Sequence, residues 1–311
     1  MRHVLIIGSG FIGQRLGRAL RDAGLEVTLS SRHWPPGLGQ EPWRCLDATR
    51  PGAIAEAVGA TGAHAVVLVH GPSDITGCES APEAAMATHA GIAARLCQEA
   101  PSVRKVLIST DNVFDGQDTS YDESRSPNPA NAYGRAKLAA EHVLLSADPG
   151  ALVVRTSLVY GYEPQGPGRG WRNFFMVVAE AVRAGQPVQA PVDHWNTPIL
   201  VDDAAAVLAR LIPGRQAGLL HLAGPDRASR FEWGQLIARS LGQDPGLVRP
   251  VERAAGRYSC RPTNACLRSL RLHQLPELSG LSISGLAAGA ARLGPLLDVP
   301  PPPASIEEVI P

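Results

Sequence analysis

Short apolar runs alternate with helical patterns along the first half of the chain. Each run is rich in leucine or β-branched residues and is followed by glycine, proline or small polar residues, as expected of buried strands. Between the runs, apolar and small residues recur three or four positions apart, which is typical of helices. This alternation predicts a doubly wound parallel sheet, the Rossmann form of the α/β class. The predicted strands cover residues 4–7, 26–29, 43–46, 65–69 and 106–108, and predicted helices cover 51–58, 82–100 and 136–145.

The pattern loosens after residue 161, where glycine and proline become frequent. A helix predicted over 204–211, with Val201-Asp202-Asp203 as its cap, and a predicted strand over 218–223 would return the chain to the sheet. The chain then continues into a second, smaller set of elements. The expected division is a dinucleotide-binding domain over 1–161 with a return segment at about 197–224, a smaller mixed substrate-binding domain over 162–196 and 225–298, and a proline-rich tail over 299–311.

The first apolar run ends in a glycine-rich turn, Gly8-Ser9-Gly10-Phe11-Ile12-Gly13, and a helical pattern follows at once. Glycines at this spacing let a pyrophosphate approach the helix N-terminus, where free N–H groups and the helix dipole favour anions. The alternative is a tight connection that binds nothing. In its strand–helix context the turn predicts a dinucleotide site made by Gly8, Gly10, Phe11, Ile12 and Gly13.

The second predicted strand ends in Ser30-Ser31-Arg32, without the carboxylate that usually holds the ribose 2′-hydroxyl of NAD. Hydroxyls and a guanidinium suit a 2′-phosphate, so Ser31 and Arg32 favour NADPH, with NAD still possible; Arg32 is otherwise a solvated side chain. Residues at the ends of later strands are further candidates for the cofactor site. For His70, a polar position in a loop that binds nothing explains the sequence equally well. These further candidates are Asp47, Ala48, Val69, His70 and Gly71.

The candidate catalytic residues lie between positions 105 and 141. The apolar run there ends in Ser109 and Thr110, and Tyr133 precedes Lys137 by four positions, which places both on one face of a helix. A lysine ammonium beside a phenol is expected to lower the tyrosine pKa toward neutrality. Such a phenol can protonate a carbonyl oxygen or deprotonate an alcohol, and a strand-end hydroxyl could bind the same oxygen. A solvated helix face is the ordinary alternative for Tyr-x-x-x-Lys.

The composition indicates which partners and which cellular location to expect. The 311 residues carry 29 basic and 29 acidic side chains, so the formal net charge is zero. This balance gives no indication of nucleic acid or a membrane surface as a partner. The five cysteines are scattered and form no Cys-x-x-Cys, so no disulfide framework and no metal site is expected. No signal peptide or membrane span is predicted, and we expect a cytoplasmic protein.

The motifs, taken in order, resemble those of the extended short-chain dehydrogenase/reductases. Within that group the chain is similar to the dTDP-4-dehydrorhamnose reductase family, over roughly residues 1–270. Several motifs occur in the same order as in the family, which a chance match does not explain. The matching segments are Ser109-Thr110-Asp111-Asn112-Val113-Phe114-Asp115-Gly116, Pro129 through Glu141, Arg155-Thr156-Ser157-Leu158-Val159-Tyr160-Gly161, Thr197-Pro198 with Val201-Asp202-Asp203-Ala204, and Arg261-Pro262-Thr263-Asn264.

The resemblance implies roles for these residues. Tyr133 would protonate a ketone that a nicotinamide reduces, Thr110 would orient the ketone, and Lys137 would hold the nicotinamide ribose. Ser157 to Tyr160 would lie beside the nicotinamide, and Ser109 is a further cofactor-binding candidate. The family's sugar-nucleotide pocket implies a substrate set at corresponding positions: Asp111, Asn112, Leu158, Tyr160, Arg172, Asn173, Phe174 and Asn196.

The chain also departs from the family's pattern. Its glycine turn is one residue tighter, Asn112 replaces a tyrosine, Leu158 replaces a tryptophan, and Thr88-His89 stands where an asparagine is frequent. These changes predict retained chemistry in an altered pocket. Asp193-His194 is expected to be a surface pair, and the arginines over 249–261 either meet a diphosphate or are solvated.

We therefore expect an NADPH-dependent reductase of a keto group, at C4, of a nucleotide-activated deoxysugar. An NAD-retaining epimerase or dehydratase, and a cofactor-binding regulatory homologue, are the alternatives. The nucleotide sugar is the expected partner, and a homodimer is possible. Neither the sugar nor the nucleotide follows from the motifs.

Overall fold

A parallel sheet of seven strands forms the larger part of the molecule. The computed structural model describes residues 2–35, 38–162, 173–253 and 260–298. Every pairing within this sheet is parallel, as expected of apolar runs buried on both faces. In spatial order the strands are β11 (Gly218–Leu222), β6 (Leu152–Thr156), β5 (Arg104–Thr110), β4 (Ala65–Leu68), β1 (His3–Ile7), β2 (Glu26–Ser31) and β3 (Trp43–Cys45).

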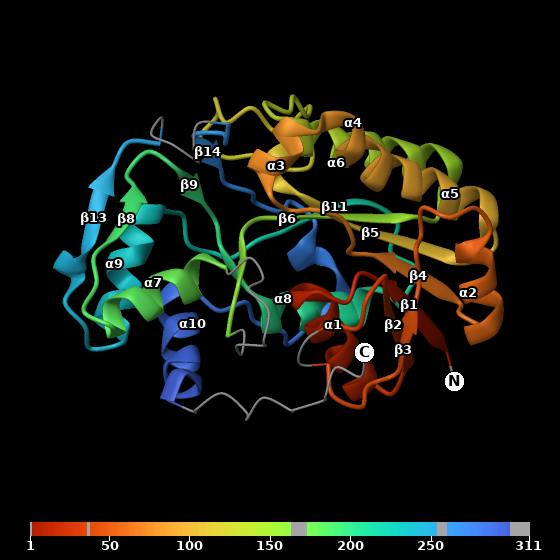
Figure 1. Ribbon diagram of the computed structural model, residues 1–311, viewed down its shortest axis with the longest axis horizontal. Coiled ribbons are helices and arrows are strands. Elements are labelled where there is room, and N and C mark those ends of the chain that lie inside the picture. The colour runs from red at the N-terminus through yellow and green to blue at the C-terminus, as the bar shows by residue number, and fades with distance from the viewer. Residues whose placement is uncertain (1, 36–37, 163–172, 254–259, 299–311) are drawn as a thin grey trace, which may run out of the picture.

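Helices cover both faces of this sheet, so the fold is a doubly wound Rossmann fold (Figure 1). One face packs on α1 and α8 through residues such as Leu16 and Leu208, and the other on α2, α5 and α6 through residues such as Ile54 and Leu144. Their bounds are α1 (Phe11–Asp22), α2 (Ala53–Thr61), α5 (Ile92–Glu99), α6 (Ala132–Ala147) and α8 (Val201–Leu211).

The strand order reverses direction beside β1. The chain runs from β1 outward through β2 and β3, then crosses to β4 on the other side of β1. In such sheets, ligands bind outside the carboxyl ends of the strands at this switch point. Gly8 and Val69, which follow β1 and β4, therefore border the expected binding crevice.

A smaller mixed unit adjoins the sheet and has its own apolar core around Trp233 and Phe175 (Figure 1). Strand β11 comes from the second half of the chain but belongs to the large sheet, where it pairs with β6. Further elements are β7 (Val159–Tyr160), α7 (Phe174–Arg183), β8 (Val188–Pro191), β9 (Trp195–Asn196), β10 (Ile199–Leu200), β12 (Ala228–Ser229), α9 (Arg230–Ser240), β13 (Val248–Val251), β14 (Asn264–Ala265) and α10 (Leu286–Leu293), with 3₁₀ turns at Asp111–Val113, Pro245–Leu247, Leu272–Gln274, Pro276–Leu278 and Gly294–Asp298.

The helix predicted over 82–100 has an irregular middle. It consists of α4 (Pro82–Met86), a π-helical turn η1 (Ala87–Gly91) and α5, and it follows a short helix α3 (Ile75–Ser80). A π turn inserts one residue into the helix and often lies at a functional site. Here it carries His89 into the interior, where 2% of its surface is exposed.

Asp203 does not cap a helix that starts after it, because α8 already begins at Val201 with Leu200 as its N-cap. The Asp203 carboxylate instead accepts hydrogen bonds from the backbone N–H of Ser284 and the guanidinium of Arg292, both at 2.7 Å. The residue therefore ties α8 to the C-terminal segment.

Candidate active site

Three glycines shape the connection from β1 to α1, each for a different reason. Gly8 has a φ of +119°, and a Cβ there would lie 2.7 Å from the backbone nitrogen of His70. A Cβ on Gly13 would lie 1.9 Å from the carbonyl oxygen of Gly8. A Cβ on Gly10 would meet nothing within 4 Å, so the backbone at the start of α1 faces open space. Dense packing below and open space above suit close approach of a phosphate to the helix N-terminus.

The open space belongs to a cavity of about 460 Å³ at the carboxyl ends of the strands. Most of the predicted site residues line it. They are Gly10, Phe11, Ile12, Gly13, Val69, His70, Gly71, Ser109, Thr110, Asp111, Asn112, Tyr133, Lys137, Ser157, Leu158 and Asn196.

Tyr133 reaches the end of β5 because α6 begins unusually close to the turn that follows that strand. A Cβ on Gly134 would lie 2.0 Å from the carbonyl oxygen of Asn112, so only glycine permits this approach. Asn131 caps α6 by accepting a hydrogen bond from the N–H of Gly134 at 2.8 Å and also donates to the side-chain oxygen of Asn112. As a result Tyr133 lies within hydrogen-bonding reach of Thr110.

The expected lowering of the Tyr133 pKa is wrong in this structure. Burial and the nearby Asp111 carboxylate raise the pKa of Tyr133 above its usual value, and the neighbouring Thr110 side chain offsets only part of this rise. The Lys137 ammonium donates to the carbonyl oxygen of Ile108 at 2.6 Å, and burial lowers the pKa of Lys137 to about 8. Tyr133 is thus a neutral phenol at neutral pH, which is the form that can give a proton.

Asp111 connects the end of β5 to the segment around β9. Its carboxylate accepts hydrogen bonds from Ser157 at 3.0 Å, from Asn196 at 3.2 Å and from Thr110 at 3.2 Å. Burial nevertheless dominates and raises the pKa of Asp111 to about 6, although these hydrogen bonds and the charge of Arg230 oppose the rise.

This raised pKa predicts a pH-dependent contribution to stability. Between the unfolded value of 3.8 and the folded value of about 6, the folded protein binds a proton at Asp111 that the unfolded chain lacks. The stabilisation is therefore present at low pH and lost as the pH rises through 6. We expect the parent to gain about 2 kcal/mol relative to Asp111→Asn between pH 7.5 and 4.5, measured by urea unfolding. An unchanged difference would contradict a raised pKa.

A buried ion pair lies close to the candidate catalytic residues. The Arg155 guanidinium on β6 donates to the Glu141 carboxylate on α6 through Nε at 3.0 Å and Nη2 at 2.6 Å, and both side chains are almost fully buried. Ser109 also donates to Glu141. Glu141 lies one helical turn after Lys137, so its bonds to Arg155 and Ser109 join α6 to β6 and to β5, the strand that ends at Thr110.

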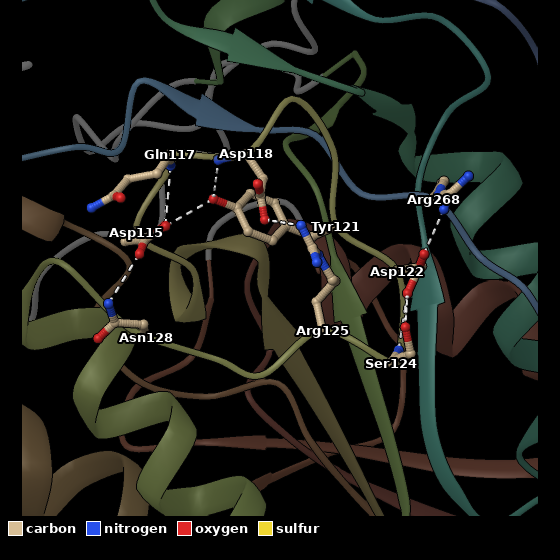
Figure 2. Close-up of polar contacts among 9 residues, drawn as sticks. All are labelled: Asp115, Gln117, Asp118, Tyr121, Asp122, Ser124, Arg125, Asn128 and Arg268. Atoms are coloured by element: carbon tan, nitrogen blue, oxygen red, sulfur yellow. Dashed lines mark hydrogen bonds and ion pairs between the residues drawn. The ribbon is translucent and has the colours of Figure 1, made fainter.

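Asp115 organises the loop between Thr110 and Tyr133 (Figure 2). Its carboxylate accepts from the Tyr121 hydroxyl at 2.9 Å, from the Asn128 amide at 2.9 Å and from the Gln117 N–H at 3.1 Å. A Cβ on the next residue, Gly116, would lie 2.7 Å from both Pro262 and the Thr263 nitrogen. Two segments that the sequence singled out separately, 109–116 and 261–264, therefore pack against each other.

Three predicted substrate residues do not line the cavity. Tyr160 is fully buried in the core of the smaller unit, edge-on to Trp233. Asn173 caps α7 and donates to the Gly161 carbonyl at 3.0 Å, and Phe174 packs on Trp233. The structure thus gives these residues structural roles, because their side chains turn toward the core. Arg172, the fourth of these predicted substrate residues, lies outside the described residues.

Several predicted cofactor residues also lie beyond the cavity lining. Gly8 begins the glycine turn and packs against the backbone of Val69 and His70. The remaining four lie at the same edge of the sheet: Ser31 is the last residue of β2, Arg32 follows it, and Asp47 and Ala48 come soon after β3. The Ser31 hydroxyl is fully engaged: it accepts from Ser9 and from Trp43 at 2.9 Å and donates to the His33 carbonyl at 2.7 Å. Asp47 is exposed and accepts from Thr49.

The cavity includes residues that sequence reasoning missed. His194, expected at the surface, is 3% exposed, and burial followed by the charges of nearby arginines lowers its pKa well below the ordinary value. Arg230, with its guanidinium 4.9 Å from the Phe174 ring centre, and His89 also line the cavity. Arg261 lines it too, and it is one of the arginines over 249–261 that the sequence singled out. The departure at Thr88-His89 was a signal for His89; nothing in the local pattern marked Arg230.

The glycine turn, the strand-end hydroxyls and the Tyr133–Lys137 pair around one cavity define an extended short-chain dehydrogenase/reductase, a class of NAD(P)-dependent oxidoreductases. The model of the RmlD substrate binding domain matches residues 1–279, and the chain belongs to this family.

Named relatives agree with this assignment. A probable low-salt glycan biosynthesis reductase of Haloferax volcanii is 30% identical, over 83% of this chain and 87% of the relative. A dTDP-4-dehydrorhamnose reductase of Mycobacterium tuberculosis is 32% identical, over 81% of this chain and 80% of the relative. The crystal structure of the Bacillus anthracis dTDP-4-dehydrorhamnose reductase in complex with NADP has the same fold, with a TM-score of 0.80 at 22% identity over 94% of this chain and 98% of that chain.

In the described part of the chain, no helix has the length and apolar character needed to cross a membrane.

Proposed function

We propose that this protein reduces a keto group, at C4, of a nucleotide-activated deoxysugar, with NADPH as reductant and Tyr133 as proton donor. One observation carries the proposal: Thr110, Tyr133 and Lys137 converge on the cavity that the glycine turn opens. The complete set also argues against a regulatory homologue with a degenerate site. We place the reaction in the cytoplasm.

Each of the three side chains has a defined task in this reaction. The Thr110 hydroxyl, fixed at the end of β5, orients the ketone oxygen toward Tyr133. The neutral Tyr133 phenol gives its proton to that oxygen as the carbonyl carbon is reduced. Lys137 holds the ribose of the cofactor and supplies positive charge that stabilises the phenolate left behind. The bound dinucleotide supplies the hydride.

Another part of the cavity lining suits a diphosphate. Arg230 and Arg261 bring two guanidinium groups to it, in a chain with no net charge. Guanidinium groups bind phosphates through charge-assisted, often bidentate hydrogen bonds. The relatives named as reductases of dTDP-linked sugars support the same substrate class. Asn112 and Leu158 line this cavity where the family has aromatic residues, so the sugar pocket differs in shape.

A panel of nucleotide-linked ketosugars, followed by NADPH absorbance and by the stereochemistry of the product, tests the proposal. We expect at least one 4-ketosugar to oxidise NADPH stoichiometrically, and we expect dTDP-4-dehydrorhamnose to be a poor substrate. Redox-neutral conversion of a sugar with retained NAD would instead show an epimerase or dehydratase. High kcat/KM on dTDP-4-dehydrorhamnose, with no better substrate, would contradict the argument from Asn112 and Leu158.

The choice of NADPH rests mainly on Arg32. The Ser31 hydroxyl already has its partners, whereas Arg32 is exposed at the end of β2. A 2′-phosphate beside this guanidinium gains a charge-assisted hydrogen bond, worth about 1.5–3 kcal/mol. We expect Arg32→Ala to weaken NADPH binding at least tenfold while NADH binding changes little, as measured by calorimetry.

Arg44 provides a matched control for this prediction. It is an exposed arginine on the neighbouring strand β3, paired in register with Ser30. Arg44→Ala is expected to leave the preference for NADPH within about twofold, since general charge effects at the surface are screened. If the parent bound NADH as tightly as NADPH, the cofactor assignment would be wrong.

A further inference from the structure

The first turn of α6, which carries Tyr133, is bound to α3 by a carboxylate that the proposed reaction does not use. The Glu79 side chain on α3 accepts a hydrogen bond from the backbone N–H of Ala132 at 2.7 Å. Ala132 is the first residue of α6 and directly precedes Tyr133. Glu79 also pairs with the Arg135 guanidinium, with 3.5 Å between Oε1 and Nη2. One carboxylate therefore contacts both sides of the turn that presents the phenol.

A helix N-terminus needs such partners, because its first N–H groups have no acceptor within the helix. In α6 the Asn131 side chain accepts from the N–H of Gly134 at 2.8 Å. The N–H of Ala132 finds its acceptor in Glu79, which lies 53 positions earlier in the chain. Helix ends are among the first parts of a fold to open locally. Tyr133, the second residue of α6, lies in the turn that such opening would move.

The helix that carries Glu79 is itself fixed beside this turn. Asp74 caps α3 by accepting from the N–H of Thr76 at 3.1 Å. Cys78, next to Glu79, is 2% exposed and belongs to a small apolar cluster against which Tyr133 packs. The two helices α3 and α6 thus meet beside the phenol through both apolar packing and a hydrogen bond.

We propose that Glu79 is a positioning residue for the proposed reaction: by binding the N–H of Ala132 it holds the first turn of α6 and so fixes the phenol of Tyr133 at the end of β5. Glu79 is not part of the cavity lining, so it acts through Tyr133 and contacts neither cofactor nor ketone. The inference rests on the proposed function, because it takes Tyr133 as the proton donor. A misplacement of about 1 Å is enough to lower a rate by about 10²-fold.

Three variants of Glu79 separate the hydrogen bond from the charge. Glu79→Ala removes the acceptor. Glu79→Gln removes the charge but keeps the length of the side chain and an oxygen that can accept from the N–H of Ala132. Glu79→Asp keeps the charge on a shorter side chain, and it replaces Glu79→Ala if that variant does not fold. Glu83→Ala, at an exposed glutamate on α4, is the matched control for the loss of a surface carboxylate.

The rates are measured with NADPH and with the ketosugar of the panel that the parent reduces fastest. We expect Glu79→Ala to lower kcat on the order of 10-fold, with KM and the dissociation constant for NADPH within about twofold of the parent. Glu79→Gln is expected to keep kcat within about threefold, because its amide oxygen replaces the carboxylate as acceptor. Glu83→Ala is expected to match the parent. Hydrogen exchange, followed by NMR, is expected to be faster at the Ala132 amide in Glu79→Ala.

A double-variant cycle shows where Glu79 acts. Once the phenol is gone, its position no longer affects the rate. The variant that combines Glu79→Ala with Tyr133→Phe is therefore expected to have a kcat within about twofold of Tyr133→Phe alone. A residue with only a general structural role would lower kcat by the same factor in both backgrounds. Thermal unfolding and NADPH binding check that every variant is folded.

The outcomes distinguish this inference from the function on which it rests. A parent that reduced no ketosugar of the panel would overturn the proposed function and the inference with it. An active parent with an equally active Glu79→Ala, or with unchanged exchange at the Ala132 amide, would overturn the inference alone. Equal losses in Glu79→Ala and Glu79→Gln would also overturn it, because the charge would then be responsible. The same holds for a loss confined to KM, or for an equal loss in the Tyr133→Phe background.

Discussion

Replacing Tyr133 by phenylalanine is expected to lower kcat on the true ketosugar by about 10²–10⁴-fold, the usual contribution of a general acid. The variant keeps the ring that packs against His89 and loses only the hydroxyl near Thr110. The dissociation constant for NADPH is expected to change little, since Lys137 and the glycine turn remain. Single-turnover oxidation of NADPH, together with calorimetric binding, separates the two effects.

Tyr160→Phe provides the matched control. Its hydroxyl is also buried, but it lies in the core of the smaller unit and has no hydrogen-bond partner among the described residues. Removing it is expected to leave kcat within about twofold and to leave stability unchanged or slightly higher. If Tyr133→Phe were folded and as active as the parent, the assignment of the proton donor would be wrong. A large loss of kcat in Tyr160→Phe would restore the substrate role first predicted for that residue.

Local patterns predicted much of the fold because each strand and helix carries its own signal. The apolar runs became β1, β2, β4 and β5 of the parallel sheet, as expected of segments that must be buried on both faces. The π turn within 82–99 was not predictable, since helix periodicity continues on either side of the inserted residue. The predicted start of α8 was also wrong. Asp203 resembled a helix cap, but its carboxylate binds a segment about eighty positions further along the chain.

The site was predictable where chemistry depends on short motifs and unpredictable where it depends on the surroundings. The spacing of Tyr133 and Lys137 was enough to place both at the cavity. The direction of the Tyr133 pKa shift was not, because it depends on burial and on the Asp111 carboxylate, which only the fold brings near. Tyr160 shows the opposite failure: its motif neighbours Ser157 and Leu158 line the cavity, but its own side chain turns into a separate core.

The buried pair of Glu141 and Arg155 is expected to give the largest effect on stability. Removing the carboxylate alone, as in Glu141→Leu, leaves the Arg155 guanidinium charged at a site where 4% of its side chain is exposed. Breaking a buried pair in this way typically costs 3–5 kcal/mol, because the remaining charge has neither water nor a counter-ion. We expect a loss of about that size in the free energy of unfolding, measured in urea at pH 7.

The double variant Glu141→Leu with Arg155→Leu distinguishes an isolated charge from lost packing. Removing both charges is expected to recover much of the loss, since apolar pairs often replace buried ion pairs at little cost. Recovery would be incomplete, because Ser109 loses the acceptor that Glu141 provides and Phe114 loses the guanidinium 5.2 Å above its ring. Asp118→Asn is the matched surface control: its pair with Arg125 is about half exposed on both sides, and such pairs contribute about 0–1 kcal/mol. If Glu141→Leu cost no more than Asp118→Asn, or if the double variant were less stable than Glu141→Leu alone, the buried pair would not hold α6 to the strands in the way proposed here.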